Sequence, residues 1–116
     1  MIVAQPDLVD VLLRAGYEQH LDGMWAVAPG WTVAIGRCAA EGDWAGAAEH
    51  QRSLTALREW FVRGSFDVFT VLMNARGIPG RFAPRPFPRL TGAQREQVLG
   101  DPAVQRLIRE DPAATA

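Results

Sequence analysis

The chain has 116 residues, of which 48% are hydrophobic, a size and composition that suit one small domain with a buried core. Its formal net charge of -1 gives no general attraction for nucleic acid or for an anionic membrane surface. No window approaches the roughly 20 apolar residues of a membrane span, and the N-terminus lacks the basic region of a signal peptide. One cysteine, Cys38, cannot form an internal disulfide, so we expect a cytoplasmic protein.

The first predicted elements are a strand end and a helix. Residues 1–4 are a short apolar run, typical of the end of a buried strand. The helix begins at Pro6-Asp7, and Gly16 is placed to stop it. Its apolar face is predicted from i, i+3, i+4 and i+7 spacing to consist of Leu8, Val11, Leu12 and Ala15.

A second strand and two more helices are predicted next. Residues 21–27 are apolar and bounded by Gly and Pro, which predicts a buried strand closed by Pro29-Gly30. Helical spacing resumes at Trp31, and Glu41-Gly42 ends that helix. Asp43 is a favourable N-cap for a long helix. The predicted buried stripe of the long helix consists of Trp44, Ala47, Ala48, Gln51, Leu54, Leu57 and Phe61.

The last part of the chain is predicted to contain three helices and one irregular connector. Residues 68–75 are apolar on most sides, so this helix should be covered on more than one face. Residues 78–90 contain four prolines and predict the connector. Thr91 with Gln94 forms a capping-box pattern, and Asp101-Pro102 starts the final helix. We expect a single domain over residues 1–110, followed by a flexible tail, 111–116.

The candidate reactive groups favour structural roles. No His, Cys, Asp or Glu cluster has the spacing of metal ligands, so we expect neither a metal nor a cofactor. Cys38 lies on an apolar helix stripe, which favours a packed thiol over a nucleophile. All 12 basic residues are arginine, and without lysine no side-chain amine of this chain can form a Schiff base.

The connector raises one alternative. Arg81, Arg85 and Arg89 are interleaved with Phe82 and Phe87, a mixture that can bind single-stranded nucleic acid. The prolines and the nearly neutral net charge favour a packed loop instead, so we do not expect a nucleic-acid partner.

Three stretches in a fixed order carry a family resemblance: AAEGDWAGAAEHQRSLTALREWF, NARGIPG and APRPFPRLT. The matching positions are Ala40, Gly42, Asp43, Ala47, Gln51, Leu54, Leu57, Gly77, Arg85, Pro86 and Leu90. Together they resemble the C-terminal part of the dihydrodipicolinate synthase/N-acetylneuraminate lyase family. The upstream stretches IVAQPD, LVDVLLRAG and LDGMWAVAP are similar to that family's seventh strand end, seventh helix and eighth strand.

The resemblance implies a mainly α-helical chain that is part of a (β/α)8 barrel. It would hold the end of the seventh strand, the seventh helix, the eighth strand, the eighth helix and the C-terminal helices. One or two short strands would then need a partner, because unpaired strand edges are costly when buried. The family's Schiff-base lysine lies on the sixth strand, outside the matched part. Bulky Met24 and Trp25 replace the usual small polar run of strand eight, and Thr70 replaces a helix lysine.

Two functions follow from the resemblance. In the first, the chain is a partner-dependent, non-catalytic subunit of a pyruvate-dependent lyase or aldolase, and it completes the barrel of a second chain that supplies the lysine. In the second, it is a stand-alone helical oligomerisation or interaction module without lyase activity. The substrate-pocket candidates in a completed barrel are Ala4, Gln5, Gly23, Met24 and Trp25. The expected packing and assembly residues are Trp31, Trp44, Leu54, Leu57, Trp60 and Phe61. No catalytic residue is expected on this chain, and its partner is a protein, either the barrel-completing chain or a second copy.

Overall fold

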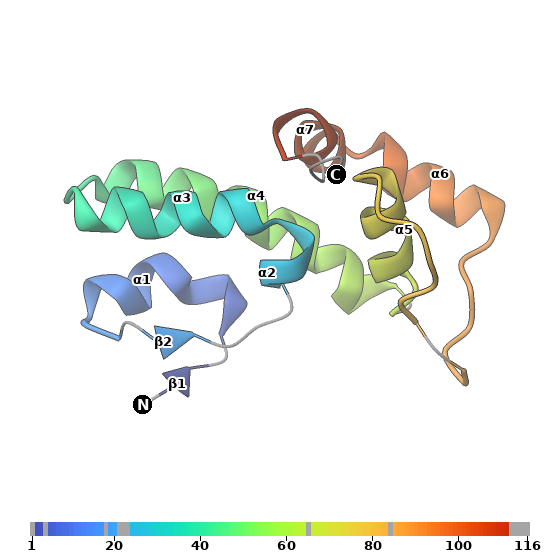
Figure 1. The fold of residues 1–116 in the computed structure, drawn as a ribbon, viewed down its shortest axis with the longest axis horizontal. Helices are drawn as coiled ribbons and strands as arrows, with labels where there is room; N and C mark the ends of the chain where they lie inside the picture. The colour runs from blue at the N-terminus through green and yellow to red at the C-terminus, as the bar shows by residue number, and fades with distance from the viewer. Residues whose placement is uncertain are drawn as a thin grey trace. The chain divides into compact units, whose positions relative to one another are not determined.

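The protein is mainly helical, as predicted (Figure 1). The structure is a computed structural model that describes residues 2–3, 5–17, 19–20, 24–64, 66–83 and 85–111. The chain divides into two compact units, Met1–Arg58 and Glu59–Ala116. None of the helices in these described ranges combines the length and the apolar character that crossing a membrane requires.

The first unit contains a small strand–helix–strand arrangement followed by helices. Its elements are β1 (Ile2–Val3), the 3-10 turn η1 (Pro6–Leu8), α1 (Val9–Arg14), β2 (Gln19–His20), α2 (Met24–Val27), α3 (Pro29–Ala40) and the first part of α4 (Trp44–Arg63). β1 and β2 pair in parallel, with Ile2 opposite Gln19. Parallel neighbours need a crossover connection, which η1 and α1 provide here.

The core of the first unit is built from its helices. α1 packs against α3, and α2 contacts α3. The buried apolar residues are Val9, Met24, Val27, Ala28, Trp31, Ile35, Ala47, Leu54 and Leu57. Leu54 and Leu57 are both fully buried, and each such side chain contributes roughly 1.5–3 kcal/mol relative to an exposed one.

The predicted apolar face of the first helix is wrong. Leu8 is 45% exposed and Val11 55% exposed, and Ala15 is exposed as well, whereas Val9 is buried. The 3-10 turn at Pro6–Leu8 places the start of α1 at Val9, and the face that points inward then begins there. Because almost every position from 8 to 13 is apolar, spacing alone fits more than one face. The predicted stop is confirmed, since Gly16 has a φ of +95°, which favours glycine.

The strand predicted over residues 21–27 is also wrong in the part that the structure describes. Met24–Val27 form α2, and the Ala28 amide donates to the Met24 carbonyl oxygen at 2.8 Å. Pro29 opens α3 instead of closing a strand, because a first helical turn does not need its missing N–H. A short apolar run cannot distinguish a buried strand from a buried helical turn. Residues 21–23 lie outside the described residues.

The turn between α3 and α4 forms as predicted. Gly42 has a φ of +73°, and the Asp43 amide donates to the Cys38 carbonyl oxygen at 2.8 Å. The Asp43 carboxylate then accepts from the Gly46 amide at 2.9 Å, which caps the start of α4. These local bonds satisfy groups that two helix ends would otherwise leave without partners.

The second unit contains the end of α4, α5 (Val68–Ala75), α6 (Gly92–Gly100) and α7 (Pro102–Glu110). α5 packs against α6, and α6 against α7. The predicted coverage of α5 on more than one face is confirmed by its run of buried residues Val68, Thr70, Val71, Leu72 and Met73. Both hydrogen bonds of the Thr91–Gln94 capping box form, and Asp101 accepts from the Ala103 amide at 2.8 Å.

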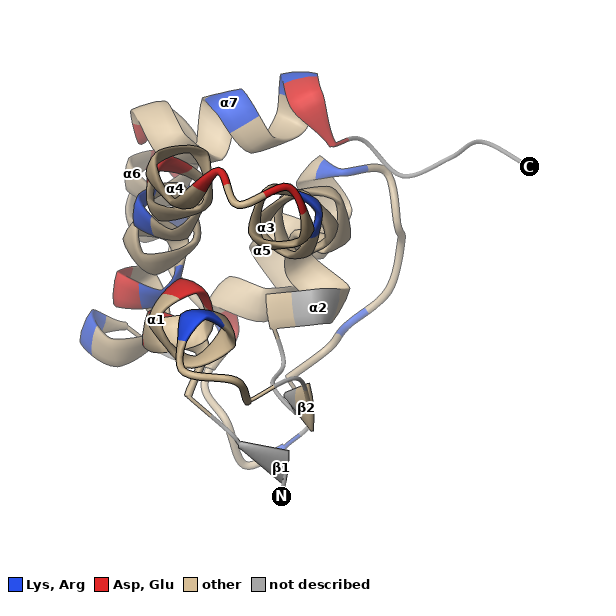
Figure 2. Ribbon diagram, turned by 90° about the vertical axis from the view of Figure 1, so that its left-hand side faces the viewer, with Lys and Arg blue, Asp and Glu red and all other residues tan. Residues whose placement is uncertain are grey.

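The connector between α5 and α6 is anchored by side-chain hydrogen bonds. Arg81 donates to the carbonyl oxygens of Ala83 and Phe87, at 2.7 and 3.1 Å. The buried Asp67 carboxylate accepts from the Leu90 amide at 2.8 Å. These bonds hold the two ends of the connector, whereas residues 85–89 are exposed, so the packed loop that we expected is present only in part. Figure 2 shows basic residues and no acidic ones along this connector.

Candidate functional site at the carboxyl end of the strands

The parallel pairing of β1 and β2 brings the segments that follow them to one edge of the small sheet. After β1 the chain passes Gln5 and enters η1, and after β2 it continues to α2. In parallel α/β folds the functional residues lie at this carboxyl edge. We therefore take the start of η1 and its surroundings as the candidate site.

The structure describes only part of the predicted pocket. Gln5 is exposed, and its carbonyl oxygen accepts from the Leu8 amide at 3.1 Å. Met24 is only 4% exposed and belongs to the core of the first unit. Trp25 belongs to α2 and not to a strand. Ala4 and Gly23 lie outside the described residues.

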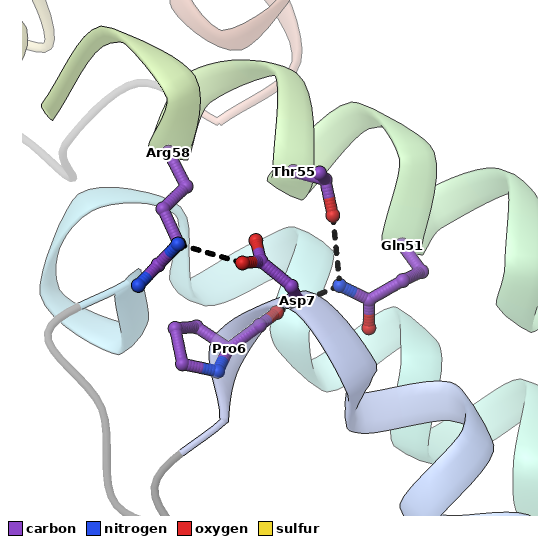
Figure 3. A network of polar contacts seen from close by, with 5 residues as sticks. All are labelled: Pro6, Asp7, Gln51, Thr55 and Arg58. Carbon is purple, nitrogen blue, oxygen red and sulfur yellow. Dashed lines mark hydrogen bonds and ion pairs between the residues drawn. The ribbon is translucent and has the colours of Figure 1, made fainter. Parts of the chain in front are cut away.

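The side chain of Gln51 in α4 is hydrogen-bonded to the segment that follows β1 (Figure 3). Its Nε2 donates to the Pro6 carbonyl oxygen at 2.7 Å and to the Thr55 hydroxyl at 3.2 Å. Its Oε1 accepts from the Asp10 amide at 3.2 Å. The side chain is 5% exposed, so a single buried amide satisfies backbone groups of both η1 and α1.

Two turns further along α4, Arg58 pairs with Asp7 of η1 (Figure 3). Arg58 Nη1 lies 2.6 Å from Asp7 Oδ2, and each side chain is 36% exposed. A partly exposed pair of this kind contributes at most about 1 kcal/mol to stability. The remaining N–H groups of Arg58 have no partner among the described residues, so the guanidinium can also bind a carboxylate. It cannot form a Schiff base.

The sequence interpretation missed this network. Gln51 was predicted to lie in the buried stripe of the long helix, and Asp7 was considered only as part of a helix start. One signal was present: a glutamine in a buried stripe must find hydrogen-bond partners. The partners themselves lie 41 and 45 residues away in sequence, beyond the range of helical spacing.

The expected packing residues occupy different environments. Trp31, Leu54 and Leu57 are buried. Trp44, Trp60 and Phe61 are half-buried. An arginine lies over each of two tryptophan rings. The Arg14 guanidinium is 5.6 Å from the Trp44 ring centre, and the Arg63 guanidinium is 4.7 Å from the Trp60 ring centre. The Phe61 ring packs edge-to-face on Phe69, with 5.9 Å between ring centres.

Titratable groups offer little acid–base chemistry. Within the described part of the chain, no three His, Cys, Asp or Glu side chains are grouped so as to hold a metal ion. The pKa of the Cys38 thiol is raised, first because burial disfavours the thiolate and next because Asp43 and Glu41 are negatively charged. Arg37 acts in the opposite direction. A raised pKa keeps this thiol protonated at neutral pH, which makes it a poor nucleophile.

We expect Cys38 alkylation by iodoacetamide to follow a pH profile whose midpoint lies above the usual cysteine value of about 8.5. Asp43→Asn should move the midpoint to lower pH, because it removes a negative charge while keeping an oxygen to cap α4. Glu49→Gln, which removes a charge that does not act on the thiol, is the control. A wild-type midpoint below 8.5, or an equal shift in the control, would contradict this account.

The chain matches no protein-family model, and no curated protein matches it. The resemblance to the lyase family therefore rests on the motifs and their order alone.

Proposed function

We propose that this chain is the partner-dependent, non-catalytic part of a pyruvate-dependent lyase or aldolase barrel. It would supply the last strand–helix–strand unit, the following helix and the C-terminal helices. A second chain would supply the other strands and the Schiff-base lysine. In this proposal the chain forms part of a (β/α)8 barrel.

The observation that supports the proposal best is the parallel pairing of β1 and β2 through α1. Consecutive parallel strands joined by a helix are the repeating unit of such a barrel. Each strand has only two residues, and in the described part of the chain the sheet contains no third strand. A two-stranded sheet is marginally stable in water, so further strands on its edges would stabilise it.

The chemistry divides between the two chains in this proposal. The partner's lysine amine condenses with the ketone of pyruvate and releases water, since no lysine is available here. This chain closes the barrel, excludes water and lines one side of the pocket with residues that follow β1 and β2. Arg58, with its spare N–H groups at the carboxyl edge, is suited to bind a carboxylate that enters from that side.

The test is reductive trapping of pyruvate. We expect borohydride to reduce the iminium to a stable amine on the lysine of a co-purified barrel chain, and only when this chain is present. Val3→Pro should weaken both the complex and the trapping, because proline removes a strand N–H. Intact-mass measurement of both chains identifies the labelled one. Trapping that is equally efficient without this chain, or failure of lysine-bearing barrel chains to bind it, would reject the proposal.

A stand-alone oligomerisation module is the second candidate, and an aromatic cluster in the second unit favours it. All five phenylalanines of the chain, Phe61, Phe66, Phe69, Phe82 and Phe87, are linked by ring contacts. Phe66 and Phe87 stack 5.2 Å apart yet are 46% and 45% exposed. Exposed apolar patches of this kind often mark interfaces. Native mass spectrometry separates the candidates: a homo-oligomer that binds no barrel chain favours this one.

A further inference from the structure

A pocket of about 290 Å³ lies within the second unit, lined by residues of α5, the connector and α6. Arg89 of the connector and Arg95 of α6 both line it. Among the described residues that line it, the others are neutral, with Thr70 and Asn74 as the polar ones. The described lining of the pocket therefore combines two positively charged side chains with no acidic one.

The two arginines are unlike several other arginines of the chain. Arg58, Arg76 and Arg106 each form an ion pair, and Arg81 donates two hydrogen bonds to the connector. Arg89 and Arg95 have neither an ion pair nor a side-chain hydrogen bond within the described residues. Both arginines are exposed, and like charges that line one pocket repel each other, so a bound anion would relieve that repulsion.

The position of Arg95 is unfavourable for the helix that carries it. Arg95 follows the capping box by one residue, in the first turn of α6, and no acidic residue stands in that turn. The N-terminal end of a helix carries a partial positive charge, so a cation there is disfavoured by a few tenths of a kcal/mol or more. A bound anion would interact favourably with Arg95 and offset the cost of a cation in this turn.

The neutral walls are held rigidly enough to shape a site. Asn74 Nδ2 donates to the carbonyl oxygens of Ile78 and Gly80, at 2.8 and 3.1 Å, which pins the turn after α5. The Thr70 hydroxyl accepts from the Phe82 amide at 2.9 Å. Its hydrogen has no acceptor among the described residues and is available to a ligand oxygen.

We propose that this pocket binds a small molecule carrying a compact dianionic group, either a phosphate or a dicarboxylate. Both chemistries present oxygens that match the forked N–H groups of arginine, and two arginines match two negative charges. The volume admits a small metabolite and not the length of a polymer. This site is independent of the proposed lyase role, since every residue that carries it belongs to the second unit.

Isothermal titration of the full chain at constant ionic strength tests the proposal, with inorganic phosphate and succinate as separate probes. We expect saturable binding of at least one of them, and tighter binding than that of acetate. Arg89→Gln and Arg95→Gln should each weaken binding by about tenfold or more, because each removes a charge-assisted hydrogen bond. The probe that binds with the higher affinity identifies which dianion the pocket prefers.

Two matched variants separate this pocket from general surface charge. Arg85→Gln makes the same charge change in the same connector, on a residue that does not line the pocket, and should alter affinity less than twofold. Ala75→Leu fills the pocket without changing charge and should abolish binding. Helical circular dichroism of every variant checks folding. Equal weakening by Arg85→Gln, retention by Ala75→Leu, or no saturable binding of either probe would overturn the proposal. Displacement of the probe by a single-stranded oligonucleotide in an Arg85-dependent manner would also overturn it.

Discussion

Gln51→Leu is expected to lower the free energy of unfolding of the first unit by about 2–3 kcal/mol. Leucine has a similar volume but forms none of the bonds that Gln51 makes to Pro6, Asp10 and Thr55. The Pro6 carbonyl oxygen and the Asp10 amide, both part-buried, would lose their side-chain partner. Leaving buried polar groups unsatisfied costs more than the net value of the bonds themselves.

Urea unfolding measures the loss as a lower midpoint with an unchanged slope. Hydrogen exchange gives the local readout, since the Asp10 amide should exchange faster in the variant. Gln97→Leu makes the same chemical change at an exposed position and should alter stability by less than about 0.5 kcal/mol. Equal stability of Gln51→Leu and wild type would mean that Gln51 does not hold η1 to α4.

Asp67→Ala is expected to destabilise the second unit by about 2–3 kcal/mol. Asp67 is 1% exposed, and its Oδ2 accepts the buried Leu90 amide from across the connector. Alanine removes this acceptor and leaves the Leu90 N–H without it. Because Leu90 lies at the end of the connector, we also expect the segment before α6 to become more mobile.

Asp67→Asn distinguishes the contribution of the accepting oxygen from that of the negative charge, because asparagine keeps an oxygen at a similar position. We expect it to recover about half of the lost stability. Glu96→Ala removes an exposed carboxylate in α6 and serves as the control. Chemical denaturation and exchange of the Leu90 amide measure both effects. An alanine variant as stable as the control would show that the connector is held by other contacts.

The features that sequence reasoning predicted well depend on residues close together in the chain. The capping box at Thr91 and Gln94, the cap at Asp101 and the turn at Gly42 all form as expected. Each relies on bonds that span five residues or fewer, or on one residue's own backbone preference. The covered helix Val68–Ala75 was predictable for a related reason, since an almost wholly apolar helix has no side to present to water.

The failures have an equally physical cause. Residues 24–27 are apolar and short, and both a strand and a helical turn can bury such a run. In the structure these residues form α2, which contacts α3. In α1 nearly continuous apolar residues allow several faces, and the 3-10 turn before it selects the one that contains Val9.

The candidate sites were visible in the sequence only in part. Composition established that no lysine is present and that the connector is basic and rich in proline and phenylalanine. It did not separate Arg81, which is bonded within the connector, from Arg89, which shares a pocket with Arg95.

The sequence by itself determined the helical character, the ends of several helices and the absence of a lysine side chain, because those depend on residue type and short-range bonding. Only the tertiary structure decided the parallel pairing of β1 with β2, the bonds made by Gln51 and Asp67, and the pocket that Arg89 shares with Arg95. The last three depend on side chains that meet others far along the chain, or on walls from separate elements. Many sequences with the same local patterns would form the same helices without making those long-range contacts.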